Sequence, residues 1–423
     1  MPAAVDPERY LASLEPVGWS FGLERMQRLC AELGEPQRSY ETLHVVGTNG
    51  KSSVTAMCAA LLGASGLRAG ACLSPHAWRW SERTRIDGAE IDPDAFAQAV
   101  AEVAAAIEVV ESGVCEGERV TQFEAAIAAS FVAFARAGVD VAVVEAGLGG
   151  RLDATNVIPS TATALTSVGL DHTEWLGDTE LEIAAEKLAV LREGTALVVG
   201  RLAPEVEELA RRTADERGAR LIAPEPLAPD LLPSALAPFL ARDAAVALAL
   251  ANEASPGPEP LGAERVTAAL AAALLPGRAQ RIPGEPPLLL DAAHNEQGAA
   301  ALAEALPEFA AGRPVYACVS VLADKDAEAI VAALAPALDG AICTAADPGP
   351  AMGRPGARAR DPRELAALLE AAGVPAEVRA EPEAAVARLL ELASERGGVA
   401  ICAGSHYLLR YAWTAKRARS SYR

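Results

Sequence analysis

Lysine and aromatic residues are scarce in this chain of 423 residues. Aromatic side chains make up only 4% of the residues, so the cores must be built from layers of Leu, Val and Ala. Among the 37 Lys and Arg residues, lysine occurs only as Lys51, Lys187, Lys325 and Lys416. Because arginine serves at almost every other basic position, each lysine needs its own explanation.

Positive charge is also in short supply, since 37 Lys and Arg residues face 57 Asp and Glu residues and the net charge is −20. A general nucleic-acid binder or a membrane-surface protein would need a positive face, so we expect no nucleic-acid or membrane partner. No apolar run approaches the roughly 18 residues that a membrane span needs. Residues 1–14 also lack the pattern of a signal peptide. We therefore expect a cytoplasmic protein.

Paired cysteine motifs are absent as well. The seven cysteines are an odd number without C-x-x-C spacing, and most of their neighbours are apolar. This pattern is typical of small buried hydrophobic residues in a reducing compartment, rather than of disulfides or metal ligands. The cysteines are Cys30, Cys58, Cys72, Cys115, Cys318, Cys343 and Cys402.

The length and the hydrophobic pattern predict an α/β protein with more than one domain. A chain of 423 residues exceeds what one core usually serves, at about 150 residues per domain. Short β-branched runs alternate with helical stretches rich in Ala and Leu, which predicts parallel sheets covered by helices. Strands are expected at 43–46, 139–144, 161–167, 196–199, 288–290, 315–319, 341–344 and 399–403. The clearest helices are expected at 96–110, 123–137, 181–191 and 365–372.

A cluster of Pro and Gly at 275–287, LPGRAQRIPGEPP, marks the best domain boundary. It predicts a P-loop-type parallel-sheet ATPase domain at 1–282, followed by a smaller Rossmann-like α/β domain at 283–423.

Residues 44–53, HVVGTNGKSS, form the strongest local motif. A strict Walker A motif would have Gly where Val45 stands, but the shorter form keeps the working parts. Its glycines let backbone N–H groups converge on phosphate, Lys51 can reach the β- and γ-phosphate oxygens, and hydroxyl groups begin a helix. The predicted nucleotide-contacting residues here are Thr48, Asn49, Gly50, Lys51, Ser52 and Ser53.

Two further strand ends carry polar side chains. Glu145 follows the apolar run 141–144, and carboxylates at the end of a parallel strand beside a phosphate loop commonly hold Mg²⁺. A solvated strand end is the alternative for Glu145. His172 follows the strand expected at 161–167, where a lone histidine is more often a hydrogen-bonded loop residue than a ligand.

These motifs, in this order, resemble the Mur ligase superfamily and specifically its folate branch, the folylpolyglutamate synthases and dihydrofolate synthases. The resemblance extends from FGLERM at 21–26 to the C-terminal helix, and GLGGRLDATN is specific to the folate branch. The matching stretches are GTNGK at 47–51, SPH at 74–76, SERTRIDG at 81–88, TQFE at 121–124, EAGLGGRLDATN at 145–156, LDHTEWLG at 170–177, EKL at 186–188, PGR at 276–278, LLLDAAHN at 288–295, VLADKD at 321–326 and GSHYLL at 404–409.

The resemblance implies a monomeric ATP-dependent amide ligase. ATP would phosphorylate a pterin-linked carboxylate, and the amine of L-glutamate would attack the acyl phosphate. The acceptor would be dihydropteroate, a reduced folate or both, and the cofactors ATP and two Mg²⁺ ions. The alternatives are a monofunctional folylpolyglutamate synthase, a superfamily ligase for another carboxylate, a P-loop ATPase or kinase without ligation, and a degenerate binding protein.

The resemblance also implies the metal ligands. They are a hydroxyl of the phosphate loop, Ser74, Glu145 and His172. The family usually has glycine where Ser52 stands, so Ser53 matches the ligand by position and either serine remains open.

Lys187 lies on the expected helix 181–191 and matches a lysine that is carbamylated by CO₂ in the family. The resemblance implies that this carbamate is a carboxylate-like group at the second metal, so Lys187 also counts among the expected metal-site residues. A carbamate needs a neutral amine, which arginine cannot supply. The alternative is an exposed lysine paired with Glu182 or Glu186. By resemblance the catalytic residues are therefore Lys51, Glu145, His172 and Lys187.

The smaller domain is expected to complete the nucleotide site. The resemblance assigns Arg278 to phosphate and Asp291 to ribose or the inter-domain site, with His294 in the same motif. Asp243 stands where the family has an asparagine that meets adenine. Lys325 either approaches the incoming glutamate or forms a structural salt bridge.

Two segments match the dihydropteroate site of bifunctional members, and Phe123 could stack on a pterin ring. A core position at the start of a helix is the alternative for Phe123. Lys416 fits a solvated helix face. The residues of the two segments are Thr121, Gln122, Phe123 and Glu124, and Leu152, Asp153 and Ala154.

Overall fold

The computed structural model describes residues 6–14, 22–112, 119–234, 236–254, 261–348 and 357–420, with side chains up to residue 414 in the last helix. Phe21, Cys115 and the side chain of Lys416 lie outside the described residues. The chain forms two compact units, and the division between them falls between Leu274 and Leu275.

The first unit is built on an eight-stranded sheet in the order β4-β3-β2-β5-β1-β6-β7-β8. Strands β2, β5, β1, β6, β7 and β8 run parallel, whereas β3 and β4 continue one edge in antiparallel pairing. The strands are β1 Glu41–Val46, β2 Ala69–Cys72, β3 Thr84–Ile86, β4 Ala89–Glu90, β5 Val141–Glu145, β6 Ala162–Leu165, β7 Ala196–Val199 and β8 Arg220–Ile222.

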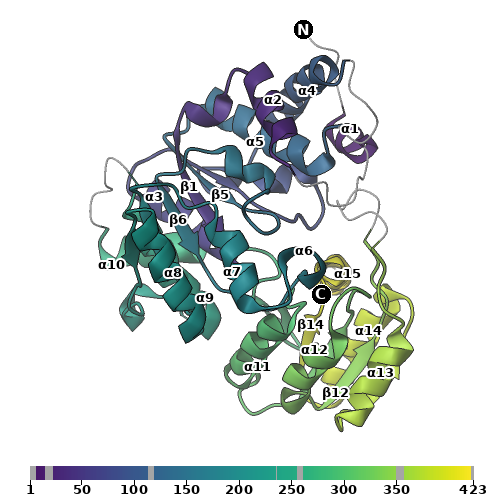
Figure 1. Cartoon of the computed structure of the whole chain (residues 1–423). Coiled ribbons are helices and arrows are strands. Elements are labelled where there is room, and N and C mark those ends of the chain that lie inside the picture. Colours follow the sequence, from purple (N-terminus) through teal and green to yellow (C-terminus); the bar gives the residue numbers. More distant parts are fainter. Residues whose placement is uncertain are drawn as a thin grey trace. The chain divides into compact units, whose positions relative to one another are not determined.

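Helices cover the first sheet and supply its cores (Figure 1). One core joins α1, α2, α4 and α5 to β2 and β5, and another joins α7 and α8 to β1, β6 and β7. Both consist mainly of aliphatic side chains, as the low aromatic content predicts. The helices are α1 Pro7–Ser13, α2 Glu24–Glu32, α3 Lys51–Ala64, α4 Pro93–Val110, α5 Gln122–Ala137, α6 Thr173–Leu176, α7 Glu180–Leu188, α8 Pro204–Glu216, α9 Pro238–Ala251 and α10 Ala263–Ala272.

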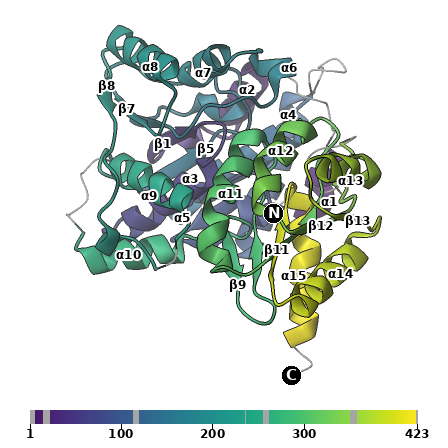
Figure 2. The ribbon, with the colours of Figure 1, turned by 90° about the horizontal axis from the view of Figure 1, so that it is seen from below.

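The second unit holds a six-stranded sheet in the order β13-β12-β11-β14-β10-β9, in which only β9 is antiparallel. Helices α11, α12 and α13 pack on one face, and α14 and α15 contact the strands as well (Figure 2). Its elements are β9 Gln280–Ile282, β10 Leu288–Leu290, β11 Val315–Val319, β12 Gly340–Cys343, β13 Ala376–Val378, β14 Val399–Ala403, α11 Glu296–Ala310, α12 Ala327–Leu334, α13 Pro362–Ala371, α14 Pro382–Glu395 and α15 His406–Ser420.

The predicted fold class is confirmed, and each predicted strand and helix has a counterpart within a few residues. Residues 275–282, which the sequence assigned to the first domain, lie in the second unit because β9 pairs with β10. The sequence missed β2, since its Ala-Gly-Ala-Cys run lacks β-branched residues, and it missed the short edge strands.

The six described cysteines are free and buried, as predicted. No helix among the described residues is long and apolar enough to cross a membrane.

Replacing Ile401 by Ala tests the core of the second unit. Ile401 is 1% exposed in β14, between β11 and β10. The free energy of unfolding should fall by about 2–5 kcal/mol in chemical denaturation, because the change leaves a cavity. Val109→Ala, at a position that is 54% exposed, is the control. If both variants lost an equally small amount of unfolding free energy, the central place of β14 in the core would be contradicted.

Candidate active site

The phosphate loop 47–50 connects β1 to α3 at the edge of the first sheet where the carboxyl ends of its parallel strands lie. Gly47 has to be glycine because a Cβ there would lie 1.9 Å from Thr166 Oγ1. Gly50 has a φ of 84° and precedes α3 in the left-handed conformation. Lys51 Nζ donates to the carbonyl oxygens of Gly47 (2.9 Å) and Thr48 (3.1 Å), so the ammonium group lies over the loop.

The segment after β6 holds this loop in place. Thr48 N–H donates to Ser167 O (2.8 Å), and Asn49 N–H donates to Ser167 Oγ (3.0 Å). Thr166 Oγ1 donates to Asn49 O at 2.6 Å. The sequence showed polar groups at this strand end but did not identify Thr166 and Ser167 as supports of the phosphate loop.

Ser52, Ser74 and Glu145 meet at the ends of three elements. Ser52 Oγ donates to Glu145 Oε1 (3.0 Å), and Ser74 N–H donates to Glu145 Oε2 (2.8 Å). Glu145 is only 2% exposed. The register explains the meeting, since Val45 of β1 pairs with Glu145 of β5 immediately before the phosphate loop. Ser52 therefore contacts the strand-end carboxylate, whereas Ser53 is buried. This contact favours Ser52 over Ser53 as the hydroxyl that meets the metal, a choice that the sequence left open.

This group suits a hard divalent cation such as Mg²⁺. Mg²⁺ typically takes one or two carboxylates, hydroxyl or water oxygens and substrate phosphates, rather than an all-protein cage. Within the described ranges, three or more His, Cys, Asp or Glu side chains never cluster as a metal site. His172 precedes α6 in the left-handed conformation, and its N–H donates to Asp171 Oδ1 at 2.9 Å.

Lys187 is buried rather than exposed, so the alternative of a solvent-facing helical lysine is wrong. It is 4% exposed, and its pKa is lowered to about 7. Burial is the main cause and the positive charge of Lys51 acts in the same direction, whereas Asp171, Asp153 and Glu186 oppose the shift. Two of the rare lysines are thus close enough to affect each other.

The loop that follows Glu145 packs directly on α7. A Cβ on Gly150 would lie 2.7 Å from Glu186 O and 2.9 Å from Lys187 O, so only glycine allows this approach. Arg151 N–H donates to Glu186 O at 3.0 Å. The loop therefore links the strand-end carboxylate to the helix that carries Lys187.

The four residues of the segment 121–124 lie at the start of α5. Thr121 and Glu124 form a capping box, and Glu124 also accepts from Arg25 Nε at 3.1 Å in a buried ion pair. Gln122 Nε2 donates to the carbonyl oxygens of Ala12 and Leu14. These polar contacts are thus internal to the protein.

Phe123 faces the loop after Glu145, because a Cβ on Gly147 would lie 2.4 Å from its ring. Phe123 is partly exposed and packs against the core at the start of α5.

The segment 152–154 places its three side chains differently. Leu152 is 42% exposed, whereas Asp153 and Ala154 are each 6% exposed. Asp153 accepts the N–H groups of Leu148 (2.8 Å) and Thr155 (2.9 Å), and burial raises its pKa.

Asp243 lies against the phosphate loop. Its Oδ1 is 2.6 Å from where a Cβ on Gly50 would lie, so the carboxylate of α9 fills the space beside this glycine.

The second unit places its predicted residues after β10. Asp291 accepts the N–H groups of Ala279 (2.7 Å) and Ala293 (2.8 Å), and burial raises its pKa while Arg278 opposes the rise. His294 Nδ1 lies 2.9 Å from Ala292 O.

Lys325 is 6% exposed, and its Nζ lies 4.0 Å from the Asp324 carboxylate, as in the salt-bridge alternative.

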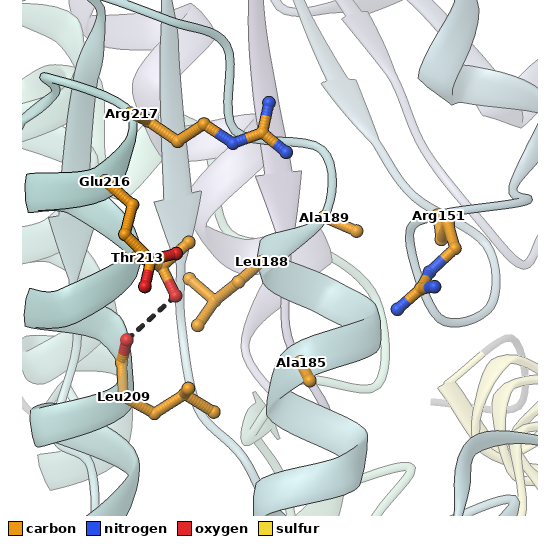
Figure 3. A pocket seen from close by; sticks show the side chains of 8 residues that line it. All are labelled: Arg151, Ala185, Leu188, Ala189, Leu209, Thr213, Glu216 and Arg217. Atoms are coloured by element: carbon orange, nitrogen blue, oxygen red, sulfur yellow. Dashed lines mark hydrogen bonds between the residues drawn. The ribbon is translucent and has the colours of Figure 1, made fainter.

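A cavity of about 410 Å³ lies between α7 and α8, away from these residues. Figure 3 shows Arg151 at one side and the side chains of α8 at the other, with Leu188 between them. None of the predicted site residues lines it.

Comparisons with known proteins identify the family of the chain. Residues 277–406 match the family model of the Mur ligase, glutamate ligase domain. The dihydrofolate synthase/folylpolyglutamate synthase of Mycobacterium tuberculosis is 34% identical over 76% of this chain and 74% of its own length.

Solved structures of folylpolyglutamate synthases have the same fold. The Mycobacterium tuberculosis enzyme complexed with ADP and AMPPCP is 30% identical, with a TM-score of 0.84 over 93% of this chain and 95% of its own. A bifunctional enzyme from Yersinia pestis, complexed with AMPPNP and Mn, is 30% identical, with a TM-score of 0.83 over 99% and 100%.

With a phosphate loop on one unit and a glutamate ligase domain on the other, the protein is an ATP-dependent ligase that joins an amino acid to an acid. The chain belongs to the folylpolyglutamate synthase and dihydrofolate synthase family, and it adds glutamate to folates with ATP and a divalent metal. The predicted family and reaction are confirmed.

Ser52→Ala should weaken the use of Mg²⁺, because Ser52 Oγ is the hydroxyl on Glu145. In a Mg²⁺ titration of ligase turnover, the half-maximal concentration should rise by about tenfold or more. Ser53→Ala is the matched control and should stay within about threefold of the wild type. The reverse order of the two variants would assign the metal to Ser53.

Proposed function

We propose that the chain ligates L-glutamate to both dihydropteroate and reduced folates, through an acyl phosphate. The contact of Ser52 and Ser74 with Glu145, beside Lys51, carries the proposal, because it gathers a cation-binding group at a phosphate loop. In the first step the γ-phosphoryl group moves to a carboxylate oxygen of the acceptor, and ADP leaves. In the second, the glutamate amine attacks the acyl carbon, phosphate leaves with that oxygen, and a proton is released.

Binding of ATP would use the loop 47–50 and the first turn of α3. Backbone N–H groups at a helix N-terminus favour anions, and Lys51 adds a mobile positive charge. Lys51 Nζ now bonds to the carbonyls of Gly47 and Thr48, so it would exchange these partners for phosphate oxygens. We assign Thr48, Asn49 and Gly50 to the same phosphates.

Ser52, Ser74, Glu145 and His172 would hold the metal, with Ser53 as the positional alternative for Ser52. When bound, the metal ions supply charge neutralisation between the anionic groups that must meet. The role of this chain is to fix the carboxylate, which two hydrogen bonds hold inside the protein.

We assign Lys187 the role of a carbamylated lysine. Burial and Lys51 keep its amine neutral above about pH 7 and protonated below. A neutral amine can attack CO₂, and the carbamate would then place a negative group near the positive charge of Lys51.

We assign the second unit to glutamate and to the nucleotide. Arg278 would meet phosphate, and Asp291, held by two N–H groups, would fix the loop from which His294 projects. Asp243 can accept from an amino group such as that of adenine but cannot donate to a ring nitrogen.

For the acceptor we assign Phe123 as a stacking surface beside Gly147. The residues around it are Thr121, Gln122, Glu124, Leu152, Asp153 and Ala154. Through their internal hydrogen bonds Thr121, Gln122 and Glu124 would shape this region. We also propose that the chain acts as a monomer in the cytoplasm, in keeping with its buried free thiols.

The proposal is tested by incubating the protein with ATP, Mg²⁺ and labelled glutamate, with dihydropteroate and tetrahydrofolate in separate reactions. Both should give products one glutamate heavier by mass spectrometry, with ADP release that requires glutamate. Extension of tetrahydrofolate alone would leave a monofunctional synthase. ADP release without glutamate, and no extended product, would indicate an ATPase.

Lys187→Arg should lower turnover by at least about a hundredfold without a loss of the fold, because guanidinium forms no carbamate. In the wild type, removal of bicarbonate and CO₂ should lower activity. Its restoration by bicarbonate should be weak below pH 7 and strong above it, since the amine loses its proton near pH 7. Circular dichroism checks the fold. Wild-type turnover by Lys187→Arg would remove the carbamate from the mechanism.

A further inference from the structure

A buried chain of hydrogen bonds joins β1 to the loop that follows β5. His44 Nε2 lies 2.9 Å from Thr155 Oγ1, and Thr155 Oγ1 donates to Asp153 Oδ1 at 2.5 Å. The other oxygen of Asp153 accepts Leu148 N–H at 2.8 Å. Since the Thr155 hydroxyl donates its hydrogen bond to the carboxylate, its oxygen accepts a hydrogen bond from His44. The neutral ring of His44 therefore carries its proton on Nε2.

A histidine at this place is costly for the fold. His44 is fully buried in β1, between Val144 of β5 and Thr163 of β6, and burial lowers its pKa to about 3, so the ring is neutral. Its Nδ1 has no hydrogen-bond partner among the described residues. An aliphatic side chain would fill β1 without burying a polar ring. The fold alone therefore gives no reason for a histidine.

The chain of hydrogen bonds ends on the loop after β5, which touches several parts of the proposed site. Gly147 lies under the ring of Phe123, and Gly150 lies on the carbonyls of Glu186 and Lys187. Leu148, which the Asp153 carboxylate holds, stands between these two glycines. A shift at Leu148 would therefore move the acceptor side of the site, whereas the phosphate loop is held separately by Thr166 and Ser167.

We propose that His44, acting through Thr155 and Asp153, is a positioning residue that fixes the loop 147–155 for the acceptor. The inference rests on the proposed function in one respect, namely that the pterin acceptor binds beside this loop. The hydrogen bonds have a defined direction. The neutral ring donates to the Thr155 hydroxyl, the hydroxyl donates to the Asp153 carboxylate, and the carboxylate accepts from a backbone N–H of the loop.

Thr155→Val removes the hydroxyl and keeps the shape of the side chain. The KM for tetrahydrofolate should rise by about five- to tenfold, the effect of one or two lost hydrogen bonds. The KM for ATP should stay within about twofold, because its loop has other supports. Thr155→Ser restores the hydroxyl and should return the KM for tetrahydrofolate to near the wild-type value.

Thr163→Val is the matched control. Thr163 is also fully buried, directly opposite His44 in the neighbouring strand β6, and its Oγ1 has no hydrogen-bond partner among the described residues. The change therefore alters the packing beside the ring and leaves the hydrogen-bond chain intact. Its substitution should change neither KM. His44→Leu should keep or raise the melting temperature and still raise the KM for tetrahydrofolate, a combination that a merely structural histidine would not give.

Amide hydrogen exchange of the full chain tests the loop without any substrate. Exchange in residues 147–155 should be faster in Thr155→Val and unchanged in Thr163→Val. Unchanged exchange in Thr155→Val, or a fall in melting temperature for His44→Leu with both KM values altered equally, would overturn the proposal. If the wild type extends no pterin, the proposed function fails, and hydrogen exchange in Thr155→Val and His44→Leu still decides whether this hydrogen-bond chain holds the loop.

Discussion

Parallel pairing of β1 with β5 and β6 is the constraint on which the site depends. Val45 pairs with Glu145, and Val46 pairs with Leu165, so the loops after three strands leave the sheet at the same edge. In the sequence the loop after β1 is far from the other two, and the three loops share no local pattern. In the sheet they become neighbours: residues 166–167 hydrogen-bond to the phosphate loop, and Ser52 of α3 donates to Glu145. The phosphate loop, the strand-end carboxylate and the Thr166 support are therefore one assembly.

The second constraint is electrostatic. The chain carries a net charge of −20, whereas ATP, glutamate and folates are all anions. Attraction must therefore be local, from the N-terminus of α3, Lys51 and the metal that we propose beside Glu145. Burial of Lys187 fits the same logic, because a lysine with a pKa near 7 can become an anionic carbamate, which an arginine cannot. The scarcity of lysine thus separates two chemically specialised residues from a background of arginine.

Much of this could be predicted from the sequence, because local patterns record local structure. The strand, glycine turn and helix around Lys51 announce a phosphate loop, and the strand before Glu145 is evident from its apolar run. The contact of Ser52 with Glu145 could not be predicted, since it depends on how far α3 turns after Gly50. The partners of Asp153 were equally hidden, because the sequence does not show that this carboxylate is buried and accepts N–H groups of its own loop.

The edge strands and β2 escaped prediction for a related reason. Their residues form strands because neighbouring strands offer hydrogen bonds, not because their side chains prefer the conformation. The buried histidine of β1 shows the opposite case. Its presence conflicts with a simple aliphatic strand, and such a conflict with local preference often marks a functional position.

The central claim is that ATP activates the acceptor carboxylate before glutamate attacks. The most direct test uses tetrahydrofolate labelled with ¹⁸O in the carboxylate that receives glutamate, followed by mass spectrometry of the released phosphate. The account predicts one ¹⁸O atom in each phosphate, because that oxygen leaves with the phosphoryl group. Unlabelled phosphate, formed together with the extended product, would contradict it.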